Sequence, residues 1–428
     1  MFLCIHNGNI VDGKGETFLN KDILIEDNKI VEIGMGLSSK ADQVIDAEGL
    51  WVLPGLVDAH CHLRDPGYEY KEDIISGTQS AAAGGFTSVA CMPNTEPAID
   101  NVAMAQYIKF KASTQGCIRV YPIGAITKGR KGKEMVEMGE MKRAGVVGLS
   151  DDGDPLSDPT LMRHSLEYSK QFGLLIISHC EDMSLTGDGV MNEGYISTIL
   201  GLKGINRSAE DVMTARDVIL SEITGAPIHI AHVSTEGSVD IIRRAKSRGT
   251  LVTCETAPHY FSATEEWVEG YDTNTKVNPP LRTEKDVHAI KKGIQDGTID
   301  IIATDHAPHH IDEKQVEYNS AASGITGFET AFSLSYTNLV ESGVLTLAEL
   351  TQKMSTLPAK ILGIQGGILE PGALGDITIV DINCQYTIDA QKFYSKGKNT
   401  PFHGKSLKGK VVYTLVDGKV IYEKGSIL

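Results

Sequence analysis

Apolar and polar residues alternate at both ends of the chain, whereas the middle follows a different pattern. Over residues 1–54, short alternating segments are separated by turns of Gly, Asn and Asp, which is typical of a small antiparallel sheet. The same pattern returns near the C-terminus in DITIVDI, QYTID, GKVVYTLV and GKVIYEKG. A few hairpins alone bury too little apolar surface to be stable. We therefore expect both ends to build one β-sandwich domain, from residues 1–54 and 366–428.

In the middle, short apolar segments alternate with longer segments of helical periodicity, the sequence form of repeated βα units. Eight strands are expected, at residues 56–59, 87–92, 118–123, 146–149, 174–178, 228–231, 251–254 and 300–303. Helices are expected between several of them, at 102–113, 159–172, 209–224 and 237–247. Eight such units predict an α/β fold, a (β/α)8 barrel over residues 55–365, with its functional residues at the C-terminal strand ends.

Ionisable side chains follow five of these eight strands: His60 and His62, then Asp151 and Asp152, then His179, His232 and Asp305. Alternate residues of a strand point the same way, so His60 and His62 can bind one ion together. Imidazole and carboxylate are the ligands of zinc and similar divalent ions. Four histidines and two carboxylates suit a pair of ions about 3.5–4 Å apart that share a bridging group.

Each of these residues also has a simpler explanation. A lone histidine at a strand end is more often a hydrogen-bonded, partly buried side chain, and Asp305 can cap the next helix. Asp151 and Asp152 belong to DDGD, a sequence whose Asp and Gly residues are favoured in turns. Their joint occurrence at one end of the expected barrel favours the metal centre. Either aspartate can supply the bridging carboxylate.

Composition narrows the class of protein. The chain has 40 basic and 56 acidic residues, a net charge of −16, which argues against a nucleic-acid partner. No apolar run approaches the roughly 18 residues of a membrane span, and the first residues do not form a signal peptide. We therefore expect a cytoplasmic protein without a membrane partner. Its seven cysteines are expected to be reduced thiols.

Several motifs point to one family. They are DAHCHLRDPG at Asp58, GGFTSVACMPNTEP at Gly84, SDDG at Ser150, SHCED at Ser178, HIAHVST at His229, KVNPPLR at Lys276 and TDHAPHH at Thr304. With these motifs, spread almost end to end, the chain closely resembles the long bacterial dihydroorotases of the amidohydrolase superfamily. The resemblance implies reversible, zinc-dependent interconversion of dihydroorotate plus water and N-carbamoyl-L-aspartate in pyrimidine biosynthesis. It also implies a homodimer, and it leaves association with a transcarbamoylase open.

The resemblance also implies a role for each ligand. His60, His62 and Asp305 would hold the first zinc ion, and His179 and His232 the second. The family spacing favours Asp152 over Asp151 as the bridge between them. Asp305 would in addition carry the proton from the attacking water to the departing ring nitrogen.

Substrate contacts follow by the same resemblance: Arg64, Asn94 and His309 for the carboxylate, Asn278 for the pyrimidine ring, and backbone groups near Ser323 and Gly324 for the ring's polar edge. Arginine offers a carboxylate two parallel hydrogen bonds. The simpler alternatives are a surface salt bridge for Arg64 and turn positions for Asn94 and Asn278. Residues 305–324 are expected to form a loop over the site. Ala322 and Ser323 replace the family's usual proline and bulky residue, which puts the stiffness of this loop in question.

The alternatives are another cyclic amidase and a non-catalytic homologue. Hydantoinases and allantoinases share the expected fold but bridge their metals with a carboxylated lysine on the fourth strand. Here that segment reads AGVVGLSDDG, and the nearest lysine is Lys142 in the preceding helical segment. Non-catalytic homologues that support a transcarbamoylase lose metal ligands, whereas this chain keeps all six. A catalytic dihydroorotase is therefore the favoured interpretation.

Overall fold

Eight parallel strands form the central sheet, and each pairs with its neighbours along the chain. The computed structural model describes residues 1–428. The strands are β6 (Leu56–Cys61), β7 (Phe86–Cys91), β8 (Arg119–Gly124), β9 (Gly148–Leu149), β10 (Leu175–Ser178), β13 (Ile228–Ile230), β14 (Val252–Thr256) and β15 (Ile301–Ile302). The sequence prediction of eight barrel strands is confirmed, each within a few residues.

The barrel closes where its first and last strands end. The backbone N–H of Asp305 donates to the carbonyl of His60 (3.0 Å), and the N–H of His62 donates to the carbonyl of His306 (2.8 Å). The closing seam therefore runs through three of the predicted metal ligands. Their backbone positions are fixed by the hydrogen bonds that make the barrel continuous.

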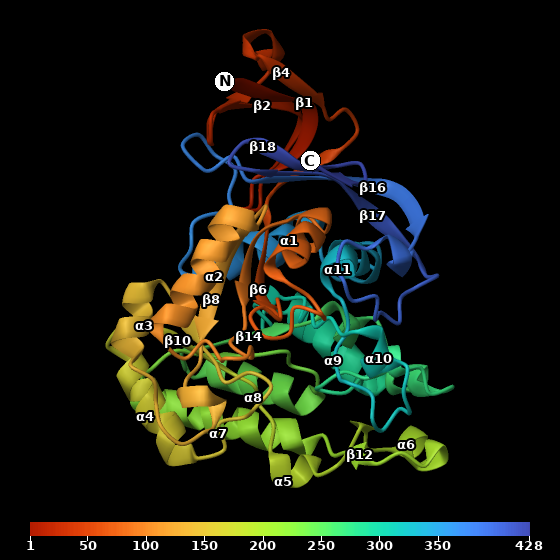
Figure 1. Cartoon of the computed structure of the whole chain (residues 1–428). Helices are drawn as coiled ribbons and strands as arrows, with labels where there is room; N and C mark the ends of the chain where they lie inside the picture. Colours follow the sequence, from red (N-terminus) through yellow and green to blue (C-terminus); the bar gives the residue numbers. More distant parts are fainter.

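Helices surround the barrel and connect its strands (Figure 1). The helices that complete the eight units are α1 (Ile74–Ala83), α2 (Val102–Gln115), α3 (Met138–Ala144), α4 (Pro159–Lys170), α7 (Ser208–Thr224), α8 (Glu236–Ser247), α9 (Glu284–Gln295) and α11 (Phe328–Ser335). In α8, Val239, Ile242 and Ala245 recur every third residue and are buried, which is the stripe that packs a helix on a core. No helix combines the length and apolar character that crossing a membrane requires.

Shorter elements lie in the connections. They are α5 (Met183–Thr186), β11 (Met191–Asn192), α6 (Tyr195–Leu200), β12 (Gly204–Ile205), α10 (Ile311–Lys314), α12 (Leu347–Thr351) and α13 (Leu357–Leu362). Ala359 and Leu362 of α13 pack against the apolar side chains of the barrel interior, such as Val57 and Ile301. One end of the barrel is therefore filled by apolar side chains, and the opposite end carries the predicted ligands.

A separate sheet is built from both ends of the chain, and the two termini lie together on it at the top of Figure 1. Its nine strands are β1 (Phe2–Val11), β2 (Thr17–Glu26), β3 (Lys29–Gly34), β4 (Gln43–Asp46), β5 (Trp51–Pro54), β16 (Ile377–Thr387), β17 (Ser406–Val416), β18 (Lys419–Glu423) and β19 (Ser426–Ile427). Strand β5 pairs antiparallel with β16 and joins the two ends. The expected sheet from both termini is confirmed, while the domain division at residues 54/55 and 365/366 stays a prediction.

Candidate metal centre

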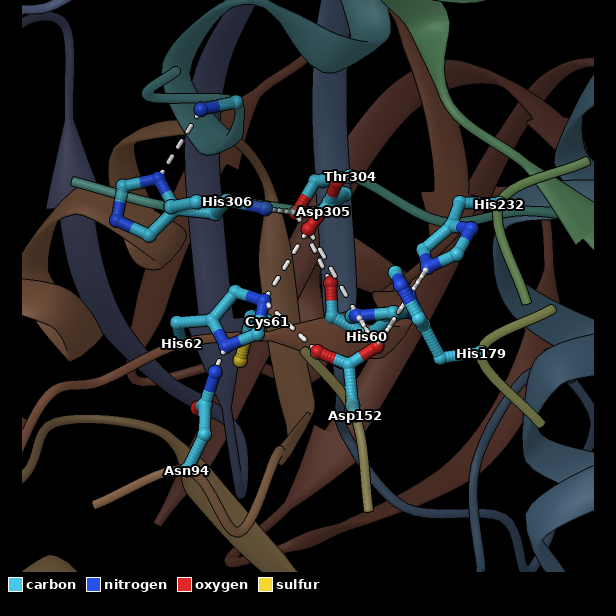
Figure 2. Close-up of polar contacts among 12 residues, drawn as sticks. His60, Cys61, His62, Asn94, Asp152, His179, His232, Thr304, Asp305 and His306 are labelled. Atoms are coloured by element: carbon cyan, nitrogen blue, oxygen red, sulfur yellow. Dashed lines mark hydrogen bonds and ion pairs between the residues drawn. The ribbon is translucent and has the colours of Figure 1, made fainter. Parts of the chain in front are cut away.

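The six predicted metal ligands meet at the C-terminal ends of the barrel strands (Figure 2). The Asp152 carboxylate lies among the four histidines. Its Oδ1 is 3.4 Å from His60 Nε2, 3.5 Å from His232 Nε2 and 3.6 Å from His179 Nδ1. Its Oδ2 is 3.6 Å from His62 Nε2. The structure thus brings together four histidines of which the two farthest apart in sequence, His60 and His232, are separated by 172 positions.

Asp305 approaches the same cluster from the other side. Its Oδ1 lies 3.2 Å from His62 Nε2 and 3.7 Å from His60 Nε2. Two trios of ligand atoms lie within 4.8 Å of one another, His60 with His62 and Asp305, and His60 with Asp152 and His232. The first trio is the set expected for the first ion. The second contains His60 in place of His179, whose Nδ1 is 2.8 Å from His232 Nε2.

The neighbouring Asp151 faces away from the histidines. Its Oδ1 accepts hydrogen bonds from the backbone N–H groups of Ile126 (2.8 Å) and Thr127 (3.1 Å), and its Oδ2 accepts one from Thr127 Oγ1 (2.5 Å). This carboxylate is fully engaged in holding the loop after β8. Of the two aspartates left open by the sequence, only Asp152 lies in the cluster.

Three of the histidines are oriented by an oxygen on their far side. Glu255 Oε1 lies 2.5 Å from His60 Nδ1, Asn94 Oδ1 lies 2.8 Å from His62 Nδ1, and Glu181 Oε2 lies 2.8 Å from His179 Nε2. With these oxygens as acceptors, each of the three nitrogens carries a hydrogen. When a metal ion takes the place of the proton on the other nitrogen, that nitrogen directs a lone pair into the cluster. This is the arrangement that fixes the tautomer of metal-binding histidines.

The centre of the cluster needs a cation. Histidine ring nitrogens and carboxylate oxygens face each other at 3.2–3.7 Å, and both kinds of atom are ligands of a bound cation. His60 Nε2 and Asp152 Oδ1 are buried and have no hydrogen-bond partner. An unpaired buried polar atom costs free energy that a bound ion would remove. The donor set therefore fits divalent metal ions of the kind that imidazole and carboxylate bind.

The electrostatic environment supports the same conclusion. Burial alone would raise the pKa of the Asp152 carboxyl, but the rings of His60, His179 and His232 hold it well below its ordinary value. Burial would lower the pKa of His179, but Asp152 and Glu181 raise it to about 10. The two shifts report the mutual attraction of the carboxylates and the histidine rings, so Asp152 is held as an anion beside ring nitrogens that favour a positive partner.

The chain turns sharply at three of these strand ends. His232, Asp305 and Arg64 have φ values of 34°, 48° and 60°, a region that residues other than glycine rarely adopt. Such conformations persist where surrounding contacts enforce them, and they are concentrated at functional sites. Here they occur at two of the predicted metal ligands and at the arginine beside them.

A second group of predicted residues lies beside the metal cluster. Arg64 Nε donates to the carbonyl of Pro308 (3.2 Å), and Arg64 forms no ion pair, so the surface salt bridge considered for it is wrong. His309 Nε2 donates to the carbonyl of Ser323 (2.8 Å) and lies 3.3 Å from Arg64 Nη2. The one N–H of the His309 ring is thus engaged by Ser323, whereas the N–H groups of Arg64 meet no carboxylate and suit an anionic oxygen.

The other predicted substrate contacts already have partners within the protein. Asn94 orients His62, and Asn278 Nδ2 donates to Glu181 (3.0 Å). The N–H of Gly324 donates to the carbonyl of Lys276 (2.9 Å), and its carbonyl accepts from Asn399 (2.9 Å). Asn94 and Asn278 thus lie on opposite sides of the cluster. The contacts of Ser323 and Gly324 with a ring stay a prediction.

Sequence reasoning missed the two glutamates that orient His60 and His179. Glu255 lies in β14, the seventh strand, for which no strand-end residue was considered, and Glu181 lies two residues after His179 in SHCED. Examining all eight strand ends would have identified Glu255. His259, three residues after β14, is buried with an unpartnered Nε2, and burial lowers its pKa to about 4, so its ring is neutral.

Comparison with protein families gives two matches along the chain. Residues 49–238 match the family described as Dihydro-orotase-like, and residues 225–422 match the Amidohydrolase family. Together these two ranges contain all six residues of the metal cluster.

Curated relatives named dihydroorotase match the whole chain. The protein from Acetivibrio thermocellus is 58% identical over 426 residues, covering 100% of both chains. The protein from Geobacter metallireducens is 57% identical over 425 residues, covering 99% of this chain and 100% of its own. Identity of this extent over full length includes both the barrel and the terminal sheet.

Solved structures with the same fold include hydantoinases. The L-hydantoinase (dihydropyrimidinase) from Arthrobacter aurescens has a TM-score of 0.90 and 27% identity, with 100% of this chain and 98% of that chain covered. The dihydropyrimidinase from Brevibacillus agri has a TM-score of 0.88 at 23% identity, with 100% and 96% covered, and shows the fold alone. By its full-length sequence identity, the chain belongs to the dihydroorotase family of the amidohydrolase superfamily.

Proposed function

We propose that this protein catalyses the reversible interconversion of dihydroorotate plus water and N-carbamoyl-L-aspartate, a step of pyrimidine biosynthesis. The observation that carries the proposal is the position of Arg64, two residues after His62 and with its N–H groups free of any carboxylate. A cluster that binds metal ions is thereby joined to a binding region for an acidic substrate. The proposal extends the family membership to a specific reaction.

The cofactor proposed is a pair of zinc ions. His60, His62 and Asp305 would hold one, His179 and His232 the other, and Asp152 would contact both, because its two oxygens face different histidines. When bound, the ions would polarise the scissile carbonyl and lower the pKa of a water molecule. The requirement for divalent metal follows from the family and the donor set, while zinc and the number of ions are part of the proposal.

Asp305 is proposed to move the proton of the reaction. Burial would raise its pKa, but His62 and His60 beside it bring the pKa below its ordinary value, so it is a carboxylate at neutral pH. As water adds to the ring carbonyl carbon, Asp305 accepts a proton from the water. As the ring C–N bond breaks, the same carboxyl gives that proton to the departing nitrogen. In the reverse direction the two transfers exchange order.

The carboxylate of dihydroorotate is proposed to bind where Arg64 and His309 converge. Burial and the nearby charge of Arg64 lower the pKa of His309 to about 2, so its ring is neutral, and the substrate carboxylate would share the one Nε2–H of this ring with the Ser323 carbonyl. The Asn94 side-chain nitrogen completes this side, and Asn278 is proposed to face the ring. Ser323 and Gly324 lie at the end of the loop that carries His309, and are proposed to meet the ring's polar edge.

Hydantoinase activity is the second candidate, because the solved structures of this fold include hydantoinases. The residues argue against it. The only lysine close in sequence to the fourth strand, Lys142, is exposed on α3, whereas Asp152 lies in the cluster. Hydantoin and allantoin rings also lack the carboxylate that Arg64 would bind.

A side-by-side assay tests the proposal. Purified protein carrying about two equivalents of zinc is given dihydroorotate, N-carbamoyl-L-aspartate, hydantoin and allantoin at matched concentrations. We expect turnover in both directions between the first two and little with the uncharged rings. Absence of any interconversion in the metal-loaded protein would refute the proposal, and faster turnover of hydantoin or allantoin would establish a different substrate.

A homodimer is also proposed. Val212, Ile219 and Ile223 are 49%, 52% and 72% exposed and recur along one side of α7, and Met183 and Leu185 of the adjacent α5 are exposed as well. Neighbouring exposed apolar side chains mark interaction surfaces. Light scattering is expected to show a dimer that Ile219→Lys with Ile223→Lys converts to a monomer. Association with a transcarbamoylase stays a prediction, to be checked by co-purification.

A further inference from the structure

Lys314 is a buried lysine in the loop between β15 and α11. It ends α10 and is 5% exposed. Its ammonium meets no carboxylate and donates instead to three backbone carbonyls, those of Ala322 (2.7 Å), Thr273 (3.0 Å) and Lys276 (3.4 Å). One side chain therefore ties the far end of its own loop to the segment that precedes Asn278.

Lys276 makes the reciprocal connection. It is 7% exposed, and its ammonium donates to the carbonyls of Asn319 (2.9 Å) and Tyr318 (3.0 Å) in the loop. Its own carbonyl accepts from the N–H of Gly324 (2.9 Å). We call Lys276 and Lys314 together the lysine clamp, because each reaches from one segment to the backbone of the other.

Burying the ammonium groups of Lys276 and Lys314 costs free energy. Burying a charge without a counter-charge is unfavourable, and an apolar side chain of similar length would pack without that cost. Lysine offers three N–H donors on one atom and no acceptor, which matches three carbonyls that point to a common centre. The clamp therefore fixes the path of irregular backbone that has few regular hydrogen bonds of its own.

The backbone that the clamp holds leads directly to the proposed carboxylate site. Ala322, whose carbonyl Lys314 holds, precedes Ser323, and the Ser323 carbonyl accepts from His309 beside Arg64. On the other segment, Lys276 is two residues before Asn278, which contacts Glu181. The clamp also accounts for a loop without the family's usual proline at this point, because Lys314 restrains Ala322 instead.

We propose that Lys276 and Lys314 are positioning residues that hold the loop of His309 in the geometry that binds the substrate carboxylate. The inference rests on the proposed function for its substrate. Neither lysine touches the metal cluster, so the clamp acts on substrate binding rather than on metal binding or proton transfer.

The test begins with Lys314→Ala, compared with Lys360→Ala as the matched control, since Lys360 is exposed on α13. We expect KM for dihydroorotate to rise about tenfold in Lys314→Ala, with kcat and bound zinc nearly unchanged. The control should match the unmodified protein. Should kcat fall with KM unchanged, or zinc be lost, the clamp would not be a substrate-positioning device.

Chemical rescue separates positioning from general stability. A cavity of about 440 Å³ lies beside Lys314 and is also lined by Thr273, His309 and Asn399, so a small amine can reach the place of the deleted side chain. Propylammonium is expected to restore KM in Lys314→Ala, and propanol, which has the same shape without the charge, is not. Equal effects of the two compounds, or no effect of either, would overturn the assignment to the ammonium.

Hydrogen exchange makes the clamp testable without any turnover. Amides of residues 318–324 are expected to exchange faster in Lys314→Ala and in Lys314→Met, which keeps an apolar side chain for folding, than in Lys360→Ala. Unchanged exchange in both variants would refute the clamp even in an active enzyme. If the unmodified protein shows no interconversion of dihydroorotate, the proposed function fails, and the exchange rates still decide whether the lysines restrain the loop.

Discussion

The candidate metal side and the proposed substrate side of the site are adjacent but are built from different interactions. On the metal side, side chains at strand ends meet other side chains, and acidic groups such as Asp152 and Glu255 surround the histidines. On the substrate side, basic side chains from loops meet backbone carbonyls, as Arg64 does at Pro308 and Lys314 at Ala322. On the metal side, carboxylates would balance the charge of bound metal ions. On the substrate side, backbone carbonyls hold the positive charges of Arg64 and Lys314.

This difference explains how one site can bind both metal cations and an anionic substrate. Carboxylates around the histidines create the negative potential that a metal ion requires. A carbonyl orients a guanidinium without cancelling its charge, so Arg64 keeps its charge for the substrate. An acid placed beside Arg64 would compete with dihydroorotate. The largest effects of mutation should therefore fall on kcat for the metal side and on KM for the substrate side.

Asp305→Ala should give the largest effect. It removes both a ligand of the first trio and the proposed proton carrier, and loss of general acid-base catalysis alone costs about 10²–10⁴-fold. We expect kcat to fall by at least that factor in both directions. Steady-state assays combined with metal analysis check it. Substantial remaining activity would exclude Asp305 as the proton carrier.

Arg64→Ala should act on the opposite side. Loss of a charge-assisted hydrogen-bond pair of about 1.5–3 kcal/mol predicts a KM for dihydroorotate raised roughly 10–150-fold. Zinc content should stay the same, because Arg64 contacts loop backbone rather than the cluster. Arg64→Lys, which keeps the charge but not the paired geometry, should lie between the two. A loss of metal in Arg64→Ala would remove the distinction between the two sides.

The sequence predicted the metal side better than the substrate side for a physical reason. The barrel places every strand end on one rim, so counting strands is enough to bring His60, His179 and Asp305 together. Choosing Asp152 over Asp151 took the family spacing, because adjacent residues differ only in which way they point. The hydrogen bonds of Asp151 to Ile126 and Thr127 settle that direction only in the folded chain.

The substrate side depends on loop paths that no periodicity encodes. The polarity of residues 305–324 predicts a loop, but the partners of Lys314 are carbonyls, which every residue possesses. No pattern of side chains could indicate them. The role of Asn94 in orienting His62 was hidden in the same way, because the contact joins two loops from different strands.

Glu255→Gln tests the carboxylate that orients the ring of His60. Its carboxylate accepts from His60 Nδ1 and lies 3.2 Å from His229 Nε2, and replacement of such a group usually weakens metal binding about 10–100-fold. Competition with a chelator should show this loss at equal total zinc, while Glu266→Gln, on an exposed residue, should bind zinc normally. Unaltered zinc affinity in Glu255→Gln would mean that the far-side oxygens orient the rings without strengthening them as ligands.

The smallest expected effect is a change with pH in the free energy of unfolding, caused by Lys314 on the substrate side. Burial and the charge of Lys276 lower the pKa of Lys314 to about 7, against the opposing influence of Asp272 and Glu313. In the unfolded chain the pKa returns to its ordinary value near 10.5. The folded state therefore binds fewer protons between these values, and its stability rises with pH in that window. From pH 6 to pH 8, Lys314 loses its proton in the folded state but keeps it in the unfolded chain. The unmodified protein should therefore gain about 1.4 kcal/mol in free energy of unfolding relative to Lys314→Met, which is the energy of about one pKa unit. Urea denaturation of both proteins at the two pH values measures this, and an equal change in both would show that the Lys314 ammonium is not held in a low-polarity environment.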